Sequence, residues 1–123
     1  MRLAAIAALA ASVFLSGQPA LAADAEAGAR VFRTQCGACH VAEAGKNRVG
    51  PSLFNIVGRK SGEVEGFRYS AANKNANIIW TPEVLDKYLT NPREMVPGTT
   101  MAYVGLRNAT QRADLVAYLE TLK

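Results

Sequence analysis

Apolar residues recur along most of this chain with the 3.6-residue period of an α-helix. The pattern predicts helices over residues 24–36, 69–75 and 81–91, and a last helix from 108 almost to 123. Residues suited to capping the first turn support these starts, and they are Asp24, Ser70, Thr81 and Asn108. The expected buried faces consist of Val31, Phe32, Val84, Leu85, Tyr88, Leu89, Leu115, Tyr118, Leu119 and Leu122. Few segments have the pattern of strands, so we expect an all-α fold.

Glycine and proline separate the predicted helices. Residues 43–51 and 58–66 are expected to be loops, and so is the segment 94–106, which has Pro97 and Gly98 at its head. Gly28 lies inside the first helix, where glycine costs about 1 kcal/mol relative to alanine. Close packing of another helix would compensate this cost. We find no internal repeat and no linker, so 123 residues predict one domain.

The N-terminal segment has a different pattern from the rest. Arg2 precedes an alanine-rich apolar run over residues 3–15, and Ala20-Leu21-Ala22 is a small-residue cleavage site. This arrangement predicts a cleavable secretory signal over 1–22, a mature domain over 23–123, and a periplasmic location. The apolar run is short for a membrane-spanning helix, and retention as an uncleaved anchor is the alternative.

The net charge is a mild +4, from 14 basic and 10 acidic residues. Without Arg2, 13 basic residues stand against 10 acidic ones, a net charge of +3. The basic residues are scattered singly and are not interleaved with aromatic residues, which excludes a nucleic-acid interface. They form either a solvated surface or a weak docking face for an acidic partner protein.

Cys36, Cys39 and His40 form the C-x-x-C-H pattern that is typical of covalent haem attachment. Each thiol can add to a vinyl group of the porphyrin, and the imidazole can hold the iron. A thioredoxin-like pair would require a βαβ pattern, and a disulfide would leave His40 unexplained. A zinc site lacks a fourth ligand, because the chain has no further Cys or His. We predict one covalent haem c held through the two cysteines.

A second iron ligand must be sought among methionines, because His40 is the only histidine. Cleavage of the signal leaves Met95 and Met101. The turn over 97–100 directly precedes Met101 and favours it, although either methionine can be a core filler. The carbonyl of Pro51 could accept a hydrogen bond from the free ring nitrogen of His40 and fix its tautomer.

Taken together, the motifs resemble class I cytochrome c, and most closely its soluble bacterial c-two type and mitochondrial members. The resemblance extends from Gly28 to Leu122. Beyond the attachment motif it rests on Val49-Gly50-Pro51, Gly58-Arg59-Lys60, Gly66-Phe67-Arg68-Tyr69, Ala72-Asn73-Lys74-Asn75, Ile79-Trp80, Tyr88-Leu89-Thr90-Asn91-Pro92, Pro97-Gly98-Thr99-Thr100-Met101 and Arg112-Ala113-Asp114-Leu115. It implies a small single-domain fold of about four to five helices around a covalently bound haem. In this fold the N- and C-terminal helices would cross, with Gly28 and Phe32 against Leu115 and Tyr118.

The resemblance also implies roles for individual residues. His40 and Met101 would ligate the iron, Pro51 would accept a hydrogen bond from His40, and Tyr88 would lie by the Met101 sulfur. A buried haem propionate would receive hydrogen bonds from Arg59, Tyr69 and Trp80, with Asn73 and Thr99 nearby. Plain core packing is the alternative for Trp80 and Tyr88.

Two filled axial positions imply a high-potential one-electron carrier rather than an enzyme. Such a monomeric protein would shuttle electrons between membrane or periplasmic redox complexes, without stable membrane insertion. The implied partners are a quinol–cytochrome c reductase, a terminal oxidase, a reaction centre or a periplasmic dehydrogenase. The alternative is a haem enzyme, a peroxidase or gas-binding protein, in which Met101 dissociates to open a site.

The chain departs from many carriers at the expected docking face. Gln35, Glu94 and Thr100 stand where those carriers have lysines, so this face is less basic. Tyr103 stands where an aromatic residue next to the haem edge is usual. The residues that can still make the face positive are Lys46, Arg48, Lys74, Lys87 and Arg93.

Overall fold

The structure is a computed structural model that describes residues 22–123. The predicted secretory signal lies outside the described residues, apart from Ala22. The described part contains five helices joined by loops: α1 (Ala25–Gln35), α2 (Ala71–Lys74), α3 (Pro82–Thr90), α4 (Pro92–Met95) and α5 (Ala109–Glu120). Within these residues there is no strand, only an isolated bridge between Lys60 and Ile79. The predicted all-α fold is therefore confirmed. None of the described helices is both long and apolar enough to cross a membrane.

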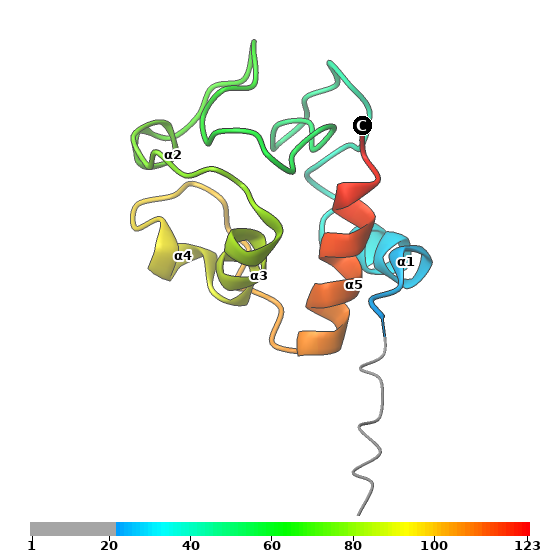
Figure 1. Cartoon of the computed structure of the whole chain (residues 1–123). Coiled ribbons are helices and arrows are strands. Elements are labelled where there is room, and N and C mark those ends of the chain that lie inside the picture. Colours follow the sequence, from blue (N-terminus) through cyan, green and yellow to red (C-terminus); the bar gives the residue numbers. More distant parts are fainter. Residues whose placement is uncertain (1–21) are drawn as a thin grey trace, which may run out of the picture.

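Helices α1 and α5 cross each other on one side of the molecule (Figure 1). Gly28 of α1 lies at the crossing, where a Cβ atom would come within 2.8 Å of the Tyr118 Cβ and closer still to the Asp114 carbonyl oxygen. The rings of Phe32 and Tyr118 pack with their centroids 5.3 Å apart. The absence of a side chain at Gly28 thus permits the close approach of the two helices, as the sequence predicts.

The predicted capping residues begin the helices. In each case a side-chain oxygen accepts hydrogen bonds from backbone N–H groups of the first turn, which have no partner within the helix. The capping residues are Asp24 for α1, Ser70 for α2, Thr81 for α3 and Asn108 for α5. Four of the helix starts therefore follow from local sequence.

Helix α4 differs from the prediction, because Pro92–Met95 forms a helical turn that includes residues 94 and 95, the first two of the segment expected to be a loop. Pro92 cannot continue α3, and Asn91 leaves the helical conformation with φ −156° and ψ 88°. The same proline is suited to the first turn of a new helix. One residue therefore accounts both for the end of α3 and for the start of α4.

The core is formed mainly by α1, α3 and α5. Leu115 is fully buried at its centre, and the other buried apolar residues are Phe32, Ile56, Trp80, Leu85, Tyr88, Leu89, Val96, Leu106, Val116 and Leu119. The predicted faces are largely confirmed, but Tyr118 and Leu122 are only half-buried, as are Val31 and Val84.

Candidate functional site

A cavity of about 400 Å³ lies between the core helices and the loops. Apolar side chains make up much of its wall, including Leu85 and Leu89 from α3 and Leu115 and Leu119 from α5. All of the site residues predicted from the sequence line this one cavity: Cys36, Cys39, His40, Pro51, Arg59, Tyr69, Asn73, Trp80, Tyr88, Thr99 and Met101. Residues that lie 65 positions apart in the sequence are thus brought to a single site.

The two cysteines and the histidine are arranged by a turn at the end of α1. Cys36 caps the helix, with its N–H bonded to the Phe32 carbonyl at 2.8 Å. The N–H groups of Cys39 and His40 then both bond to the Cys36 carbonyl, at 3.1 and 2.9 Å. Cys36 is half-buried and Cys39 is exposed. Burial, together with the neighbouring Cys39, raises the pKa of Cys36 to about 11.

The imidazole of His40 is held in one orientation by the backbone of the following loop. Its Nδ1 lies 2.7 Å from the carbonyl oxygen of Pro51. A carbonyl can only accept a hydrogen bond, so Nδ1 carries a proton, and in the neutral imidazole Nε2 then keeps a free lone pair. Burial lowers the pKa of His40, and Arg59 acts in the same direction while the bond to Pro51 opposes it. Burial thus favours the neutral imidazole, and the bond to Pro51 favours the tautomer that can bind a metal through Nε2.

Gly50 permits this loop to cover the imidazole. A Cβ atom at Gly50 would lie 2.6 Å from Nδ1 of His40 and 2.8 Å from its Nε2. We expect Gly50→Ala to displace the ring and to lower the free energy of unfolding of the haem-loaded protein by about 2 kcal/mol, the cost of overpacking a filled site. Chemical unfolding of the holoprotein measures this change. Val104→Ala is the control, because Val104 is 74% exposed and does not line the cavity, so its truncation should change stability little. Equal stability of the two variants would contradict the steric role of Gly50.

Polar contacts that the sequence did not reveal fix the position of the Pro51 carbonyl. The Asn47 side chain accepts a hydrogen bond from the N–H of Ser52 at 3.0 Å and donates one to the carbonyl of Glu65 at 3.3 Å. The buried Ser52 hydroxyl donates to the carbonyl of Glu43. These contacts hold the loop that contains Gly50 and Pro51, the two residues that lie against the His40 ring. No local pattern could indicate a contact between residues 47 and 65.

Met101 is presented to the cavity by a turn and two hydrogen bonds. Its N–H bonds to the Thr99 hydroxyl at 3.2 Å, and that hydroxyl donates to the Asn73 side chain at 2.9 Å. The hydroxyl of Tyr88 lies 3.7 Å from the Met101 sulfur. Met95 is partly buried against the core and is not among the residues that line the cavity. The structure thus separates the two methionines that the sequence offers.

Three residues that carry hydrogen-bond donors, Arg59, Tyr69 and Trp80, also line the cavity. Arg59 donates to the carbonyls of Phe54 and Ser52 at 3.0 and 2.9 Å, and burial lowers its pKa. The Tyr69 hydroxyl accepts from the N–H of Val64 at 3.0 Å, so its own hydrogen remains available. Trp80 is buried and its ring lies 4.6 Å from that of Tyr88. Donors of this kind can satisfy a carboxylate that is removed from water.

The Met101 segment is also tied to the end of α1. The hydroxyl of Tyr103 donates to the side-chain oxygen of Gln35 at 2.9 Å, across 68 positions of sequence. Both residues line the cavity. The sequence placed each of them near an expected docking face but gave no sign that they meet.

Comparison with known proteins agrees with this geometry. Residues 25–123 match the family model described as cytochrome c. The chain is 60% identical to cytochrome c of Trypanosoma brucei brucei over 82 residues, which covers 67% of this chain and 88% of the relative. It is 50% identical to cytochrome c2 of Rhodopila globiformis over 100 residues, which covers 81% of this chain and 94% of the relative.

The paired cysteines beside a histidine, in the wall of a largely apolar cavity, define a c-type haem protein. The chain belongs to the cytochrome c family, whose members carry electrons on a covalently attached haem. Haem c is accordingly held through Cys36 and Cys39. The residues present fit this group, because the cavity supplies an apolar wall, an imidazole nitrogen, a thioether sulfur and donors for carboxylates.

Proposed function

We propose that this protein is a periplasmic one-electron carrier whose iron is ligated by His40 and Met101. The observation that carries the proposal is the pair of contacts that orient the two donors. The carbonyl oxygen of Pro51 accepts a hydrogen bond from Nδ1 of His40, so Nε2 remains available. The hydroxyl of Tyr88 contacts the sulfur of Met101 in the same cavity. When bound, the haem supplies reversible one-electron chemistry at its iron. The chain supplies the ligands, their orientation and the exclusion of water.

The surroundings of these donors favour a high reduction potential. A thioether ligand stabilises the ferrous state, and an apolar wall disfavours the additional positive charge of the ferric state. Leu85, Leu89, Leu115 and Leu119 provide that wall. If His40 and Met101 both ligated the iron, oxygen or peroxide would find no free coordination position, and we therefore propose a carrier and not an enzyme.

We further propose that Arg59, Tyr69 and Trp80 hold a haem propionate, with Asn73 and Thr99 nearby. Support comes from the donors that remain unused by the protein, such as the hydrogen of the Tyr69 hydroxyl. The hydroxyl of Thr99 already bonds to Asn73, so its contribution is to place Asn73 and Met101. A buried carboxylate would otherwise be costly to remove from water.

The hydrogen bond from Tyr88 to the Met101 sulfur should raise the potential, because it withdraws electron density from the ligand. We expect Tyr88→Phe to lower the midpoint potential by about 40 mV, since a hydrogen bond contributes about 1 kcal/mol and 59 mV corresponds to about 1.4 kcal/mol for one electron. Protein-film voltammetry measures the shift. Tyr118→Phe is the control, because Tyr118 packs on Phe32 at the helix crossing. A Tyr88→Phe potential equal to that of the wild type would contradict a role for this hydrogen bond.

Carbon monoxide tests the proposed function directly. A protein with two filled axial positions should show no spectral change when carbon monoxide is added to the reduced form. Prompt binding would instead identify a peroxidase or gas-binding protein in which Met101 leaves the iron. Assay of peroxide turnover on the same sample separates these two enzymes.

The proposed partners are redox proteins that the carrier meets briefly, such as a quinol–cytochrome c reductase, a terminal oxidase, a reaction centre or a periplasmic dehydrogenase. The predicted signal and the bacterial relative support a periplasmic location. Lys46 forms an ion pair with Glu43, which weakens its contribution to a positive docking face. Val49, which lines the cavity, is an apolar residue with 77% of its surface exposed. A monomer with a weakly basic, partly apolar docking face suits short-lived complexes.

A further inference from the structure

The segment 96–107, here called the Met101 loop, is anchored firmly at its two ends. At its start the N–H groups of Val96 and Thr99 bond to the carbonyls of Pro92 and Val96, at 2.9 and 3.1 Å. At its end the N–H of Leu106 bonds to the carbonyl of Leu89, the penultimate residue of α3, at 2.8 Å. The part of the loop that follows Met101 is therefore tied to the end of α3.

Close backbone packing brings the end of the loop onto α3. Gly105 has φ +112°, which favours glycine, and a Cβ atom there would lie 2.9 Å from the carbonyl carbon of Thr90 and 3.2 Å from the Leu89 oxygen. The following residue, Leu106, is buried in the core. Backbone contact and burial thus bring residues 105 and 106 against the C-terminal turn of the helix that carries Tyr88.

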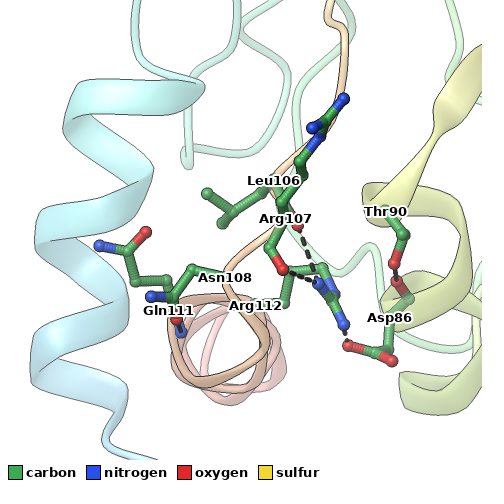
Figure 2. A network of polar contacts seen from close by, with 7 residues as sticks. All are labelled: Asp86, Thr90, Leu106, Arg107, Asn108, Gln111 and Arg112. Carbon is green, nitrogen blue, oxygen red and sulfur yellow. Dashed lines mark hydrogen bonds and ion pairs between the residues drawn. The ribbon is translucent and has the colours of Figure 1, made fainter.

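Arg112 joins this loop end to two helices (Figure 2). From the first turn of α5, its Nη1 donates to the carbonyls of Leu106 and Arg107, both at 2.9 Å. Its Nε donates to a carboxylate oxygen of Asp86 on α3 at 3.0 Å. The Arg112 side chain is only 12% exposed, whereas that of Asp86 is 47% exposed. Hydrogen bonds from a charged donor that is largely removed from water are stronger than ordinary surface contacts.

We propose that Arg112 is a positioning residue for Met101, which fixes the end of the Met101 loop against α3 and thereby limits dissociation of the sulfur from the iron. This inference rests on the proposed function, because it requires Met101 to be the ligand. A planar guanidinium can serve Asp86 and the two carbonyls at once, whereas a lysine ammonium cannot reproduce that geometry. Arg112 itself lies outside the residues that line the cavity.

The rate at which imidazole displaces Met101 in the ferric holoprotein tests the proposal. The reaction is followed by the loss of the sulfur-to-iron charge-transfer band in excess imidazole, and it reports the opening of the Met101 loop under native conditions. We expect Arg112→Met to accelerate displacement about tenfold, the factor that corresponds to losing a charge-assisted hydrogen bond. Arg112→Lys keeps the positive charge and replaces the first variant in this experiment if that variant accumulates poorly. It should also accelerate the displacement of Met101.

Leu122→Ala is the control for general loss of stability. Leu122 packs against the core at the other end of α5, away from the loop anchor. The urea midpoint of each holoprotein is measured alongside. If its urea midpoint falls about as far as that of the Arg112 variants, Leu122→Ala should still keep the rate of Met101 displacement within about twofold of the wild-type rate. Equal rates for the Arg112 and Leu122 variants, or a wild-type rate in Arg112→Lys, would overturn the proposal. A wild-type protein without the charge-transfer band would instead overturn the proposed function.

Discussion

Replacement of Met101 by alanine should abolish the sulfur-to-iron charge-transfer band of the ferric protein and lower the reduction potential by on the order of 0.2 V, a fraction of the range over which axial ligands set haem potentials. The reason is the loss of the thioether, which stabilises the ferrous state. The Met101 side chain lines the cavity and receives a contact from the Tyr88 hydroxyl at 3.7 Å. Optical spectroscopy and voltammetry of the holoprotein measure both effects.

Met95→Ala is the matched control for this change. Met95 ends α4 and packs against the core, six positions before Met101. Its truncation removes an apolar side chain of the same size without touching the cavity wall. The band and the potential should both remain close to those of the wild type. The reverse pattern, with the band lost in Met95→Ala and kept in Met101→Ala, would mean that Met95 is the ligand.

Gly28→Ala should lower the free energy of unfolding of the holoprotein by about 3 kcal/mol, the upper part of the range for overpacking. In an exposed helix interior the same change would stabilise the helix by about 1 kcal/mol. Here the added methyl group would meet the Asp114 carbonyl oxygen and the Tyr118 Cβ of α5, which are backbone and near-backbone atoms that cannot move aside cheaply. The two helices must separate, and the sign of the effect reverses. Urea unfolding measures it.

Arg30→Ala provides the comparison on the same helix. Arg30 is 59% exposed in its side chain and makes only a surface ion pair with Glu26. Its replacement should change stability by less than about 0.5 kcal/mol. A Gly28→Ala protein as stable as the wild type would show that the crossing of α1 and α5 tolerates a side chain, and would remove the explanation for a glycine inside α1.

Local signals account for the parts of the structure that the sequence predicted well. Asp24, Ser70, Thr81 and Asn108 cap helices through bonds to residues two or three positions on, so the information lies within one turn. The attachment motif is likewise local, since Cys36, Cys39 and His40 are arranged by a single turn. Pro51 and Met101 were also suggested by nearby residues, whereas the roles of Arg59, Tyr69, Asn73 and Thr99 came from a family resemblance and not from spacing. In the structure, all of these residues line one cavity.

Contacts between distant residues account for what the sequence did not reveal. The bonds from Tyr103 to Gln35, from Asn47 to Glu65 and from Arg112 to Asp86 join polar residues of ordinary type across 18 to 68 positions. Nothing in the sequence marks such a residue as paired, because a polar residue looks the same in a sequence whether or not its side chain meets a partner. The partners are set by the packing of α1, α3 and α5 and of the loops between them. Positioning contacts of this kind can be seen only in three dimensions.

X-ray absorption at the iron edge tests the central claim most directly, because it reports the atoms bound to the metal. If His40 and Met101 are the axial ligands, a sulfur neighbour and otherwise only nitrogen neighbours should surround the iron in both oxidation states. Retention of the sulfur on reduction would show a site that remains closed as the electron enters. A first shell of nitrogen and oxygen alone, in either state, would contradict ligation by Met101 and with it the proposal of a closed electron-transfer site.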